Sequence, residues 1–524
     1  MSPACPSGVD SRLSGRTRAR LAAAIAAAAL VVGACRGAPP TAPATPVTLT
    51  IGLAQPAEAG GANAGLARLA ALLASAQLVA TGPDGRPLPA LAERWERSTD
   101  ARTWRFVLRP GLSCHDGSPI TSAEVQRSLE IDNRAAQGSL VPGLRDIDRI
   151  EAPAPDVVVV RLRQPSALLL DALAQVPILG GPDASQGTGP FRLESQTAQG
   201  AVLRGFGGFY LGRPAIARVN LRPYPTPRTA WNAMLRGEVD FLHEVAPESA
   251  EFVRAASDVQ AFSFLRPYAH VVGFNLRHPV LARREVRLAL NRAIDRRFVI
   301  ARALGGRGVP ATGLVWPQHW TFDPSLVPDA FDPAAAMRAL DAAGLPVRRA
   351  AGPGGAPPAR FRFTCLVASG FPRYESFALV VQKALLDIGV DMALEPVPLR
   401  ELQTRLAAGR FDAYLLEMLA GQGLNWPYWF WHSSDAGGSP WLRSGYTAAD
   451  AALDRVRGAA DDEAFRAAVH AFQRTLLEDP PGIFLCWRET ARAVRRRFVV
   501  PGDTDRDFVN TIWRWRLAPG SRAS

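Results

Sequence analysis

The stretch TWRFVLRPG at residues 103–111, followed by HDGSPITSAEV at residues 115–125, decides the fold class. The first part alternates in the manner of a strand and then reaches Pro110 and Gly111, which stop a strand in a turn. In the second part an Asp-Gly pair favours another tight turn. Thr121 and Glu124 then stand three residues apart, as in a capping box, and predict the start of a helix. Strand, turn and capped helix in succession indicate an α/β chain.

The same alternation of short strands and helices continues on both sides of this stretch. Short alternating or continuous apolar stretches predict strands at Val47–Leu53, Asp156–Leu162, Arg218–Pro223, His270–Leu276, Phe361–Val367, Phe411–Leu416 and Gly482–Trp487. Helical spacing predicts helices at Gly65–Leu78, Thr229–Arg236, Val286–Leu304, Pro333–Ala343, Tyr374–Asp387 and Ala464–Leu477. No repeat of 20–50 residues is present, so α/β layers are expected rather than a solenoid or a propeller.

The N-terminus has the layout of a secretory signal peptide. Four arginines within residues 12–20 precede the apolar run Leu21–Val32, which is too short to span a bilayer. The run ends in VGAC at residues 32–35, which resembles a bacterial lipobox, and this resemblance implies that Cys35 is lipidated. A plain signal peptide with an incidental cysteine is the alternative. We therefore expect a signal at residues 1–34, then a lipidated cysteine and an extended Pro-rich tether over residues 35–46.

Composition indicates a globular protein of two or three ordinary domains after the tether. Hydrophobic residues make up 48% of the chain and charged residues 21%. The formal net charge is +12, but the charges are interspersed rather than gathered in a basic stripe, so no nucleic-acid partner is expected. Cys114, Cys365 and Cys486 are widely spaced. They predict either one disulfide or three buried thiols.

Several sequence blocks together resemble the family 5 extracellular solute-binding proteins, the oligopeptide, dipeptide and nickel binding proteins of ABC importers. The blocks occur in this order: LPALAERWE (88–96), TWRFVLRPG (103–111), HDGSPITSAEV (115–125), GTGPF (187–191), LRGEVD (235–240), GFN (273–275) and VRLALNRAIDR (286–296). The resemblance extends over roughly residues 47–515.

This resemblance implies a two-lobed periplasmic binding protein fold, type II-like and of cluster C, with an extra small inserted domain. The lobes of such proteins close around a solute by a hinge motion. The implied main lobe is discontinuous and comprises residues 47–80, 187–275 and 490–520. The inserted domain then covers residues 81–186, and the second lobe covers residues 276–489.

The resemblance also implies which segments border the cleft. The loop GLNWPYWFWH at residues 423–432 follows a predicted strand and carries five large aromatic side chains, which suit stacking or cation–π contacts with a bulky or cationic ligand. Peptide binders of the family often have an acidic residue here, whereas this chain has Asn425. The predicted ligand-binding residues are Tyr268, His270, Asn275, Trp316, Asn425, Trp426 and Trp429. Packing in the core is the alternative role for each of these aromatic side chains.

The sequence predicts a binding protein rather than an enzyme. It contains no G-x-S-x-G, Walker or H-E-x-x-H motif, and neither a catalytic residue, a cofactor nor a metal site is expected. The implied function is that of a monomeric, lipid-anchored binding protein in the periplasm or on the outer face of the cell membrane. It would pass a peptide or peptide-like solute to an ABC permease. The alternatives are a non-peptide solute (a metal chelate, an opine or a sugar) and a sensory or structural lipoprotein without a transporter.

Overall fold

The computed structural model describes residues 46–54, 64–135, 141–181, 183–246, 249–347, 358–433, 442–502 and 506–522. Residues Val47–Arg522 form one compact unit, and the description concerns this unit. The predicted signal peptide and Cys35 lie outside the described residues. Within the described ranges, no helix has the length and apolarity needed to cross a bilayer.

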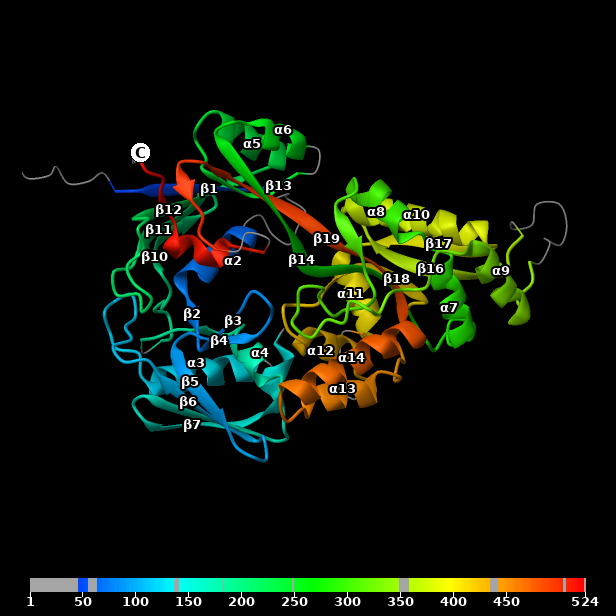
Figure 1. The fold of residues 1–524 in the computed structure, drawn as a ribbon, viewed down its shortest axis with the longest axis horizontal. Helices are drawn as coiled ribbons and strands as arrows, with labels where there is room; N and C mark the ends of the chain where they lie inside the picture. The colour runs from blue at the N-terminus through cyan, green and yellow to red at the C-terminus, as the bar shows by residue number, and fades with distance from the viewer. Residues whose placement is uncertain are drawn as a thin grey trace, which may run out of the picture. The chain divides into compact units, whose positions relative to one another are not determined.

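The centre of the fold is a mixed 11-stranded sheet, which confirms the predicted α/β class (Figure 1). Its strand order is β10 (Phe191–Thr197), β11 (Gly200–Gly205), β12 (Arg218–Tyr224), β1 (Thr48–Ala54), β13 (Phe241–Val245), β19 (Gly482–Arg495), β14 (Val259–Phe274), β18 (Ala413–Leu419), β16 (Phe361–Ala368) and β17 (Val390–Val397). The short strand β15 (Gly308–Pro310) pairs with β19 outside this path.

Two long antiparallel strands, β14 with 16 residues and β19 with 14, join the two halves of the sheet. Their pairing shifts register between Leu265 and Ala269, so Arg266, Pro267 and Tyr268 have no partner on β19. Such a bulge bends a strand and re-aims its side chains. The bend therefore lies in the middle of the strand that connects the two halves.

Helices cover both faces of the half that contains β14, β18, β16 and β17. Adjacent residues Val271 and Val272 of β14 point into different cores, as the twofold alternation of a strand requires. One core is covered by α7 (Arg284–Arg292), α8 (Arg296–Leu304), α9 (Pro333–Ala342) and α10 (Pro372–Asp387). The other is covered by α11 (Leu399–Ala407), α12 (Asn425–Trp431), α13 (Asp450–Arg457) and α14 (Asp462–Glu478). The remaining half packs against α2 (Ala64–Ala74), α5 (Pro227–Leu235), α6 (Ala250–Ala255) and η3 (Val509–Arg514).

A separate sheet lies within the predicted inserted domain, and we call it, with its helices, the four-stranded unit. It consists of β5 (Ala92–Arg97), β6 (Thr103–Leu108), β8 (Val157–Leu162) and β7 (Ile147–Ala154), with α3 (Ser122–Ala135), η1 (Pro142–Asp146) and α4 (Leu169–Leu173). The chain enters and leaves it through adjacent segments, because the carbonyl oxygen of Ala74 accepts hydrogen bonds from the N–H groups of Thr188 and Gly189 at 3.1 and 3.0 Å. The remaining short strands are β2 (Ala76–Gln77), β3 (Val79–Thr81), β4 (Pro87–Pro89), β9 (Pro177–Ile178), β20 (Phe498–Val499) and β21 (Arg516–Leu517).

Local predictions in the deciding stretch are confirmed. Gly117 has φ 88°, as the Asp-Gly turn requires, and the Thr121 N–H donates to Oε2 of Glu124 at 3.0 Å at the start of α3. Cys114, Cys365 and Cys486 are free and buried, so the prediction of three buried thiols is confirmed and the prediction of one disulfide is wrong.

Three element predictions were wrong. The helix predicted at Gly65–Leu78 ends at Ala74, and Ala76–Gln77 form strand β2. The single helix Val286–Leu304 is split into α7 and α8, because Asp295 caps α8 by accepting hydrogen bonds from the N–H groups of Arg297 and Phe298 at 3.0 Å. The aromatic stretch predicted as a loop contains helix α12, whose side chains are mostly buried against the core.

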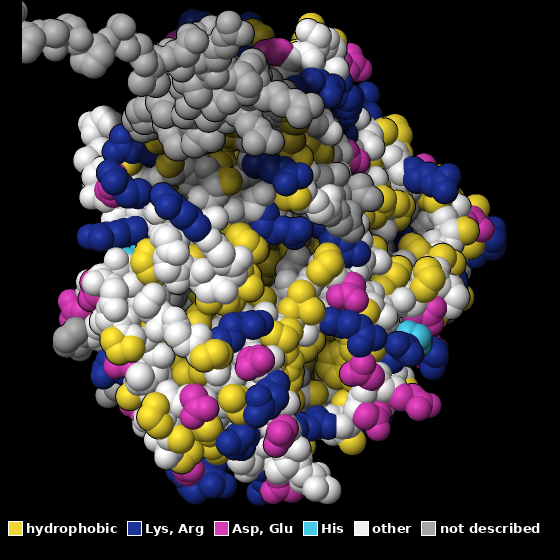
Figure 2. Space-filling view, turned by 60° about the vertical axis from the view of Figure 1, so that its left-hand side comes forward, with side chains coloured by type: hydrophobic (Ala, Val, Ile, Leu, Met, Phe, Trp, Pro, Cys, Tyr) yellow, Lys and Arg dark blue, Asp and Glu magenta, His cyan; other side chains and the backbone are white. Residues whose placement is uncertain are grey.

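Acidic and basic side chains lie next to one another over the lower half of the face seen in Figure 2.

Candidate ligand-binding site

An ionic cluster joins β13, β19 and β18 across the intervening strand β14. Arg488 on β19 donates from Nη1 to Oε1 of Glu244 at 2.9 Å and from Nε to Oε1 of Glu417 at 3.1 Å. Arg488 is only 6% exposed. Burial opposes the ionised form of both glutamates, but the adjacent Arg488 charge outweighs it, so the pKa of Glu244 and of Glu417 is lowered. We call Glu244, Glu417 and Arg488 the ionic triad.

Further charged side chains border the triad. Arg307, Arg373 and Glu489 line a small cavity of about 20 Å³ together with Glu244 and Arg488. Arg373 is partly exposed and forms no ion pair among the described residues. Burial, followed by the like charge of Arg488, lowers the pKa of Arg373. An anion at this position would relieve that repulsion.

Two predicted residues lie beside the ionic triad. The Arg266 guanidinium lies 4.5 Å from the ring centroid of Tyr268, in the unpaired bulge of β14. His270 pairs with Glu417 across β14 and β18, and its ring stacks on Phe377 at 4.1 Å. Burial lowers the pKa of His270 to about 4, so its imidazole is neutral at pH 7. Tyr268 is half-buried whereas His270 has no exposed surface, so contact with a solute remains a prediction for both.

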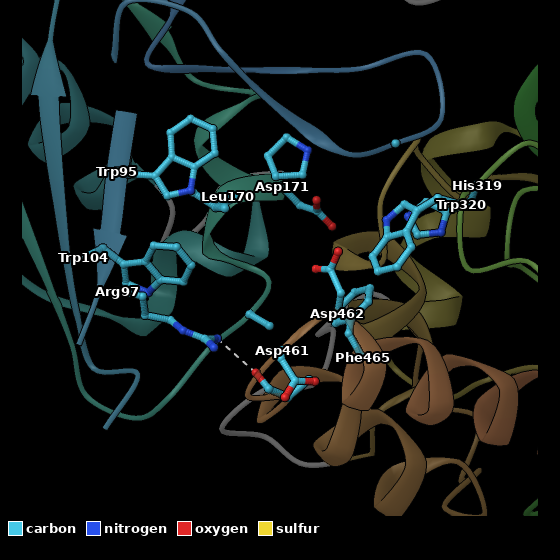
Figure 3. A pocket seen from close by; sticks show the side chains of 14 residues that line it. Trp95, Arg97, Trp104, Leu170, Asp171, His319, Trp320, Asp461, Asp462 and Phe465 are labelled. Carbon is cyan, nitrogen blue, oxygen red and sulfur yellow. Dashed lines mark hydrogen bonds between the residues drawn. The ribbon is translucent and has the colours of Figure 1, made fainter. Parts of the chain in front are cut away.

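A second cavity, of about 370 Å³, lies between the four-stranded unit and the segments around Trp320 and the start of α14 (Figure 3). We call it the aromatic cavity. Its aromatic side chains are Trp95, Trp104, His319, Trp320 and Phe465, and its charged side chains are Arg97, Asp171, Asp461 and Asp462. The remaining lining residues are Gly85, Pro87, Ala167, Leu170 and Ala459.

Contacts from several elements hold the walls of the aromatic cavity together. The Trp320 N–H donates to the carbonyl oxygen of Asp84 at 2.9 Å, and the Arg86 guanidinium lies 4.1 Å from the Trp320 ring centroid. Arg86 also pairs with Asp462 at 2.8 Å. On the opposite side, Arg97 Nη1 donates to the carbonyl oxygen of Ala459 at 3.0 Å, the contact drawn as a dashed line in Figure 3.

The predicted residues on α12 lie outside the lining of this cavity. Trp426 donates from Nε1 to Oε1 of Gln175 at 3.0 Å and is 8% exposed. Asn425 and Trp429 are 2% and 1% exposed. Leu424, just before them, donates its N–H to Asp171 on α4 at 2.8 Å. These side chains pack α12 against the four-stranded unit, and their contact with a solute remains a prediction.

The other two predicted residues have structural contacts. Trp316 is 3% exposed and belongs to the core beneath α11–α14, with Arg506 lying 5.5 Å from its ring centroid. Asn275 donates from Nδ2 to the carbonyl oxygens of Phe411 at 2.7 Å and Gly409 at 3.1 Å. It thereby fixes the end of β14 against the segment that leads to β18.

Sequence reasoning missed the ionic triad, although a local signal was present. Arg488 directly follows the apolar run GIFLCW, and Glu417 stands within the apolar stretch YLLEML. A charged side chain inside an otherwise buried strand is costly unless it is paired, and such groups gather at functional sites. The aromatic cavity had no such local signal, because its walls come from segments between residues 85 and 465.

Comparison with known proteins gives a family match over most of the chain. The sequence model of the bacterial extracellular solute-binding proteins, family 5 Middle, matches residues 86–439. The glutathione-binding protein GsiB of Salmonella typhi is 27% identical over 274 residues, covering 49% of this chain and 53% of the relative. A putative ABC transporter peptide-binding protein of Brucella ovis is 28% identical over 275 residues, covering 48% and 51%. The matches thus span about half the length of these curated relatives.

Solved structures resemble nearly the whole chain. AgaA of A. tumefaciens R10 in complex with agropinic acid has a TM-score of 0.70 at 23% identity, covering 91% of this chain and 99% of its own. NikZ of Campylobacter jejuni in complex with Ni(L-His) has a TM-score of 0.71 at 20% identity, covering 89% and 99%. AppA of Bacillus subtilis in complex with a nonapeptide has a TM-score of 0.71 at 18% identity, covering 91% and 100%. At these identities the likeness shows the fold alone, and it confirms the predicted two-lobed fold.

Proposed function

Since this chain belongs to the family 5 bacterial extracellular solute-binding proteins, we propose that it is the substrate-binding subunit of an ABC importer. It captures a peptide or peptide-like solute outside the cytoplasm and delivers it to the permease. It acts as a monomer, held by lipid on Cys35 in the periplasm or on the outer face of the cell membrane. Binding and release, without chemical conversion of the solute, are its whole activity.

The Arg373 guanidinium beside the ionic triad, which has no ion-pair partner in the described part of the chain, is the observation that carries this proposal. It is partly exposed, and the cavity that it lines also holds Arg307, Arg488, Glu244 and Glu489. A guanidinium group matches a carboxylate in both charge and fork geometry. The terminal carboxylate of a peptide, or the acid group of a peptide-like solute, would supply the missing anion.

The relatives favour a peptide-like solute over the alternatives. The two curated relatives named above are a glutathione-binding protein and a putative peptide-binding protein. Structures of the same fold hold agropinic acid and Ni(L-His), so an opine and a metal chelate belong in the same test.

Matched ligands test the proposal. The purified protein is heated with short peptides that have a free C-terminus and with the same peptides as C-terminal amides. Agropinic acid and Ni(L-His) are included as non-peptide solutes. A free-acid peptide at a hundredfold excess over its dissociation constant adds about 2.7 kcal/mol of stability and raises Tm, whereas the amide has a much smaller effect.

Arg373→Gln should weaken binding of the free-acid peptide, and Arg338→Gln, at an exposed position on α9, should not. Equal shifts with acid and amide, or a shift with a non-peptide solute alone, would contradict the peptide proposal.

The lipid anchor has a separate test. Expression with labelled palmitate in a bacterial host should label the chain, Cys35→Ser should remove the label, and Cys5→Ser should keep it. An unlabelled wild-type chain would contradict the anchor while leaving the solute-binding proposal in place.

A further inference from the structure

The aromatic cavity contains carboxylates without a basic partner, in a chain whose formal net charge is +12. Its lining has Asp171, Asp461, Asp462 and Arg97, and Asp462 is paired with Arg86 at 2.8 Å. Asp171 and Asp461 form no ion pair with a basic side chain among the described residues. These two carboxylates favour a positively charged occupant.

The aromatic walls already attract the chain's own cations at two places. Arg86 and Arg466 lie 4.1 and 5.2 Å from the ring centroid of Trp320, and Arg97 lies 5.5 Å from that of Trp104. These are cation–π distances. Among the described residues, no cation lies over the ring of Trp95, which is partly exposed and borders the same cavity.

Asp171 offers an unneutralised carboxylate on the α4 side of the cavity (Figure 3). It accepts hydrogen bonds from the backbone N–H groups of Leu424 and Asn425, and it forms no ion pair with a basic side chain in the described part of the chain. Burial raises its pKa to about 6. A ligand cation would supply the countercharge that the protein does not.

We infer that the aromatic cavity is a second binding site, which takes a small organic cation of the ammonium or guanidinium class between the Trp95 ring and the Asp171 carboxylate. The volume of about 370 Å³ lies within the range of small-molecule pockets. The site is lined by residues different from those around the ionic triad, so it goes beyond the carboxylate recognition proposed above.

Choline and its uncharged isostere 3,3-dimethylbutan-1-ol test this inference by isothermal titration of the purified full chain at pH 7.5. We expect choline to bind at least about tenfold more tightly than the alcohol, because only choline carries the charge that the rings and the carboxylate attract. Methylguanidinium serves as a second, planar cation.

Four variants locate the binding. Trp95→Leu and Asp171→Asn should each weaken choline binding about tenfold or more. Trp231→Leu, a half-buried tryptophan on α5, and Asp387→Asn, an exposed residue on α10, should leave it unchanged. In Asp171→Asn the amide oxygen can still accept the hydrogen bond from the Leu424 N–H. A circular dichroism melt checks that each variant is folded.

The inference would be overturned by no choline binding, by equal binding of choline and the alcohol, or by unchanged binding in both cavity variants. Arg373→Gln separates the two sites, since it should weaken peptide binding and leave choline binding intact. Loss of choline binding in Arg373→Gln, with Trp95→Leu unaffected, would place the cation at the ionic triad and contradict a second site.

Discussion

The backbone N–H of Leu424 donates a 2.8 Å hydrogen bond to Oδ2 of Asp171, a residue 253 positions earlier in the chain. The bond joins α4 of the four-stranded unit to the segment that begins α12. It explains how a Trp-rich stretch without a local capping side chain can start a helix, because the cap comes from another part of the fold.

Asp171 should make the folded state less stable as the pH rises. Its pKa is raised from 3.8 to about 6, so between these values the folded protein holds a proton that the unfolded chain has released. Ionisation of this carboxyl therefore lowers the free energy of unfolding by up to about 3 kcal/mol above pH 6. Relative to Asp171→Asn, the wild type should lose stability from pH 4 to pH 7 in urea unfolding. A constant difference between the two proteins would contradict the raised pKa.

His270 should make the folded state more stable as the pH rises. Its pKa is lowered to about 4 by burial, so between pH 4 and 6.5 the unfolded chain binds a proton that the folded protein does not. The stability associated with the neutral ring is present above pH 6.5 and is lost as the pH falls to 4, by up to about 3 kcal/mol. His270→Leu should remove this dependence in the same urea series. If the wild type and the variant change in parallel with pH, the ring is not held neutral.

Substitutions at two glycines with nearly the same φ should distinguish the cost of backbone strain from the cost of a steric clash. Gly85 and Gly117 have φ 87° and 88°, but only at Gly85 would a Cβ lie 2.1 Å from the Gln422 carbonyl oxygen and 2.4 Å from the His319 ring. Gly117→Ala should cost about 1–2 kcal/mol from the left-handed conformation alone. Gly85→Ala should cost clearly more, because backbone from two segments must move apart. Equal unfolding free energies for the two variants would contradict the close approach.

Substitution of Arg488 should lower the free energy of unfolding far more than substitution of an exposed arginine. Arg488→Met leaves the mostly buried Glu417 and the partly exposed Glu244 without their common partner and should cost about 3 kcal/mol at pH 7. Adding Glu417→Gln should recover part of this loss. Arg236→Met breaks an exposed pair with Glu238 and should cost no more than about 1 kcal/mol. Comparable losses at both positions would contradict a buried triad.

The three described cysteines should be unreactive in the folded protein. Cys114, Cys365 and Cys486 are buried, and burial raises the pKa of all three thiols, to about 12 for the latter two. Because the thiolate is the nucleophile, iodoacetamide should modify these peptides only in denaturant. Modification in native buffer, read by peptide mass spectrometry, would show that the surrounding core opens.

The sequence by itself determined the class of fold and the family, because these depend on local order along the chain. Strand alternation, the Asp-Gly turn and the Thr121–Glu124 pair are short-range patterns, and the structure has each of them in place. The sequence also contains the signal that separates α7 from α8, because Asp is a preferred N-cap residue and Asp295 stands at this position.

The tertiary structure alone decided which side chains meet. The ionic triad draws on β13, β18 and β19, and the aromatic cavity joins Trp95 on β5 with Phe465 on α14. It also placed Trp316, Asn425 and Trp429 in tight packing, and for the two tryptophans burial of the large apolar ring is favourable. Periodicity along one segment reports which face is buried but not what lies against it. That partner is set by the long-range pairing of strands hundreds of residues apart.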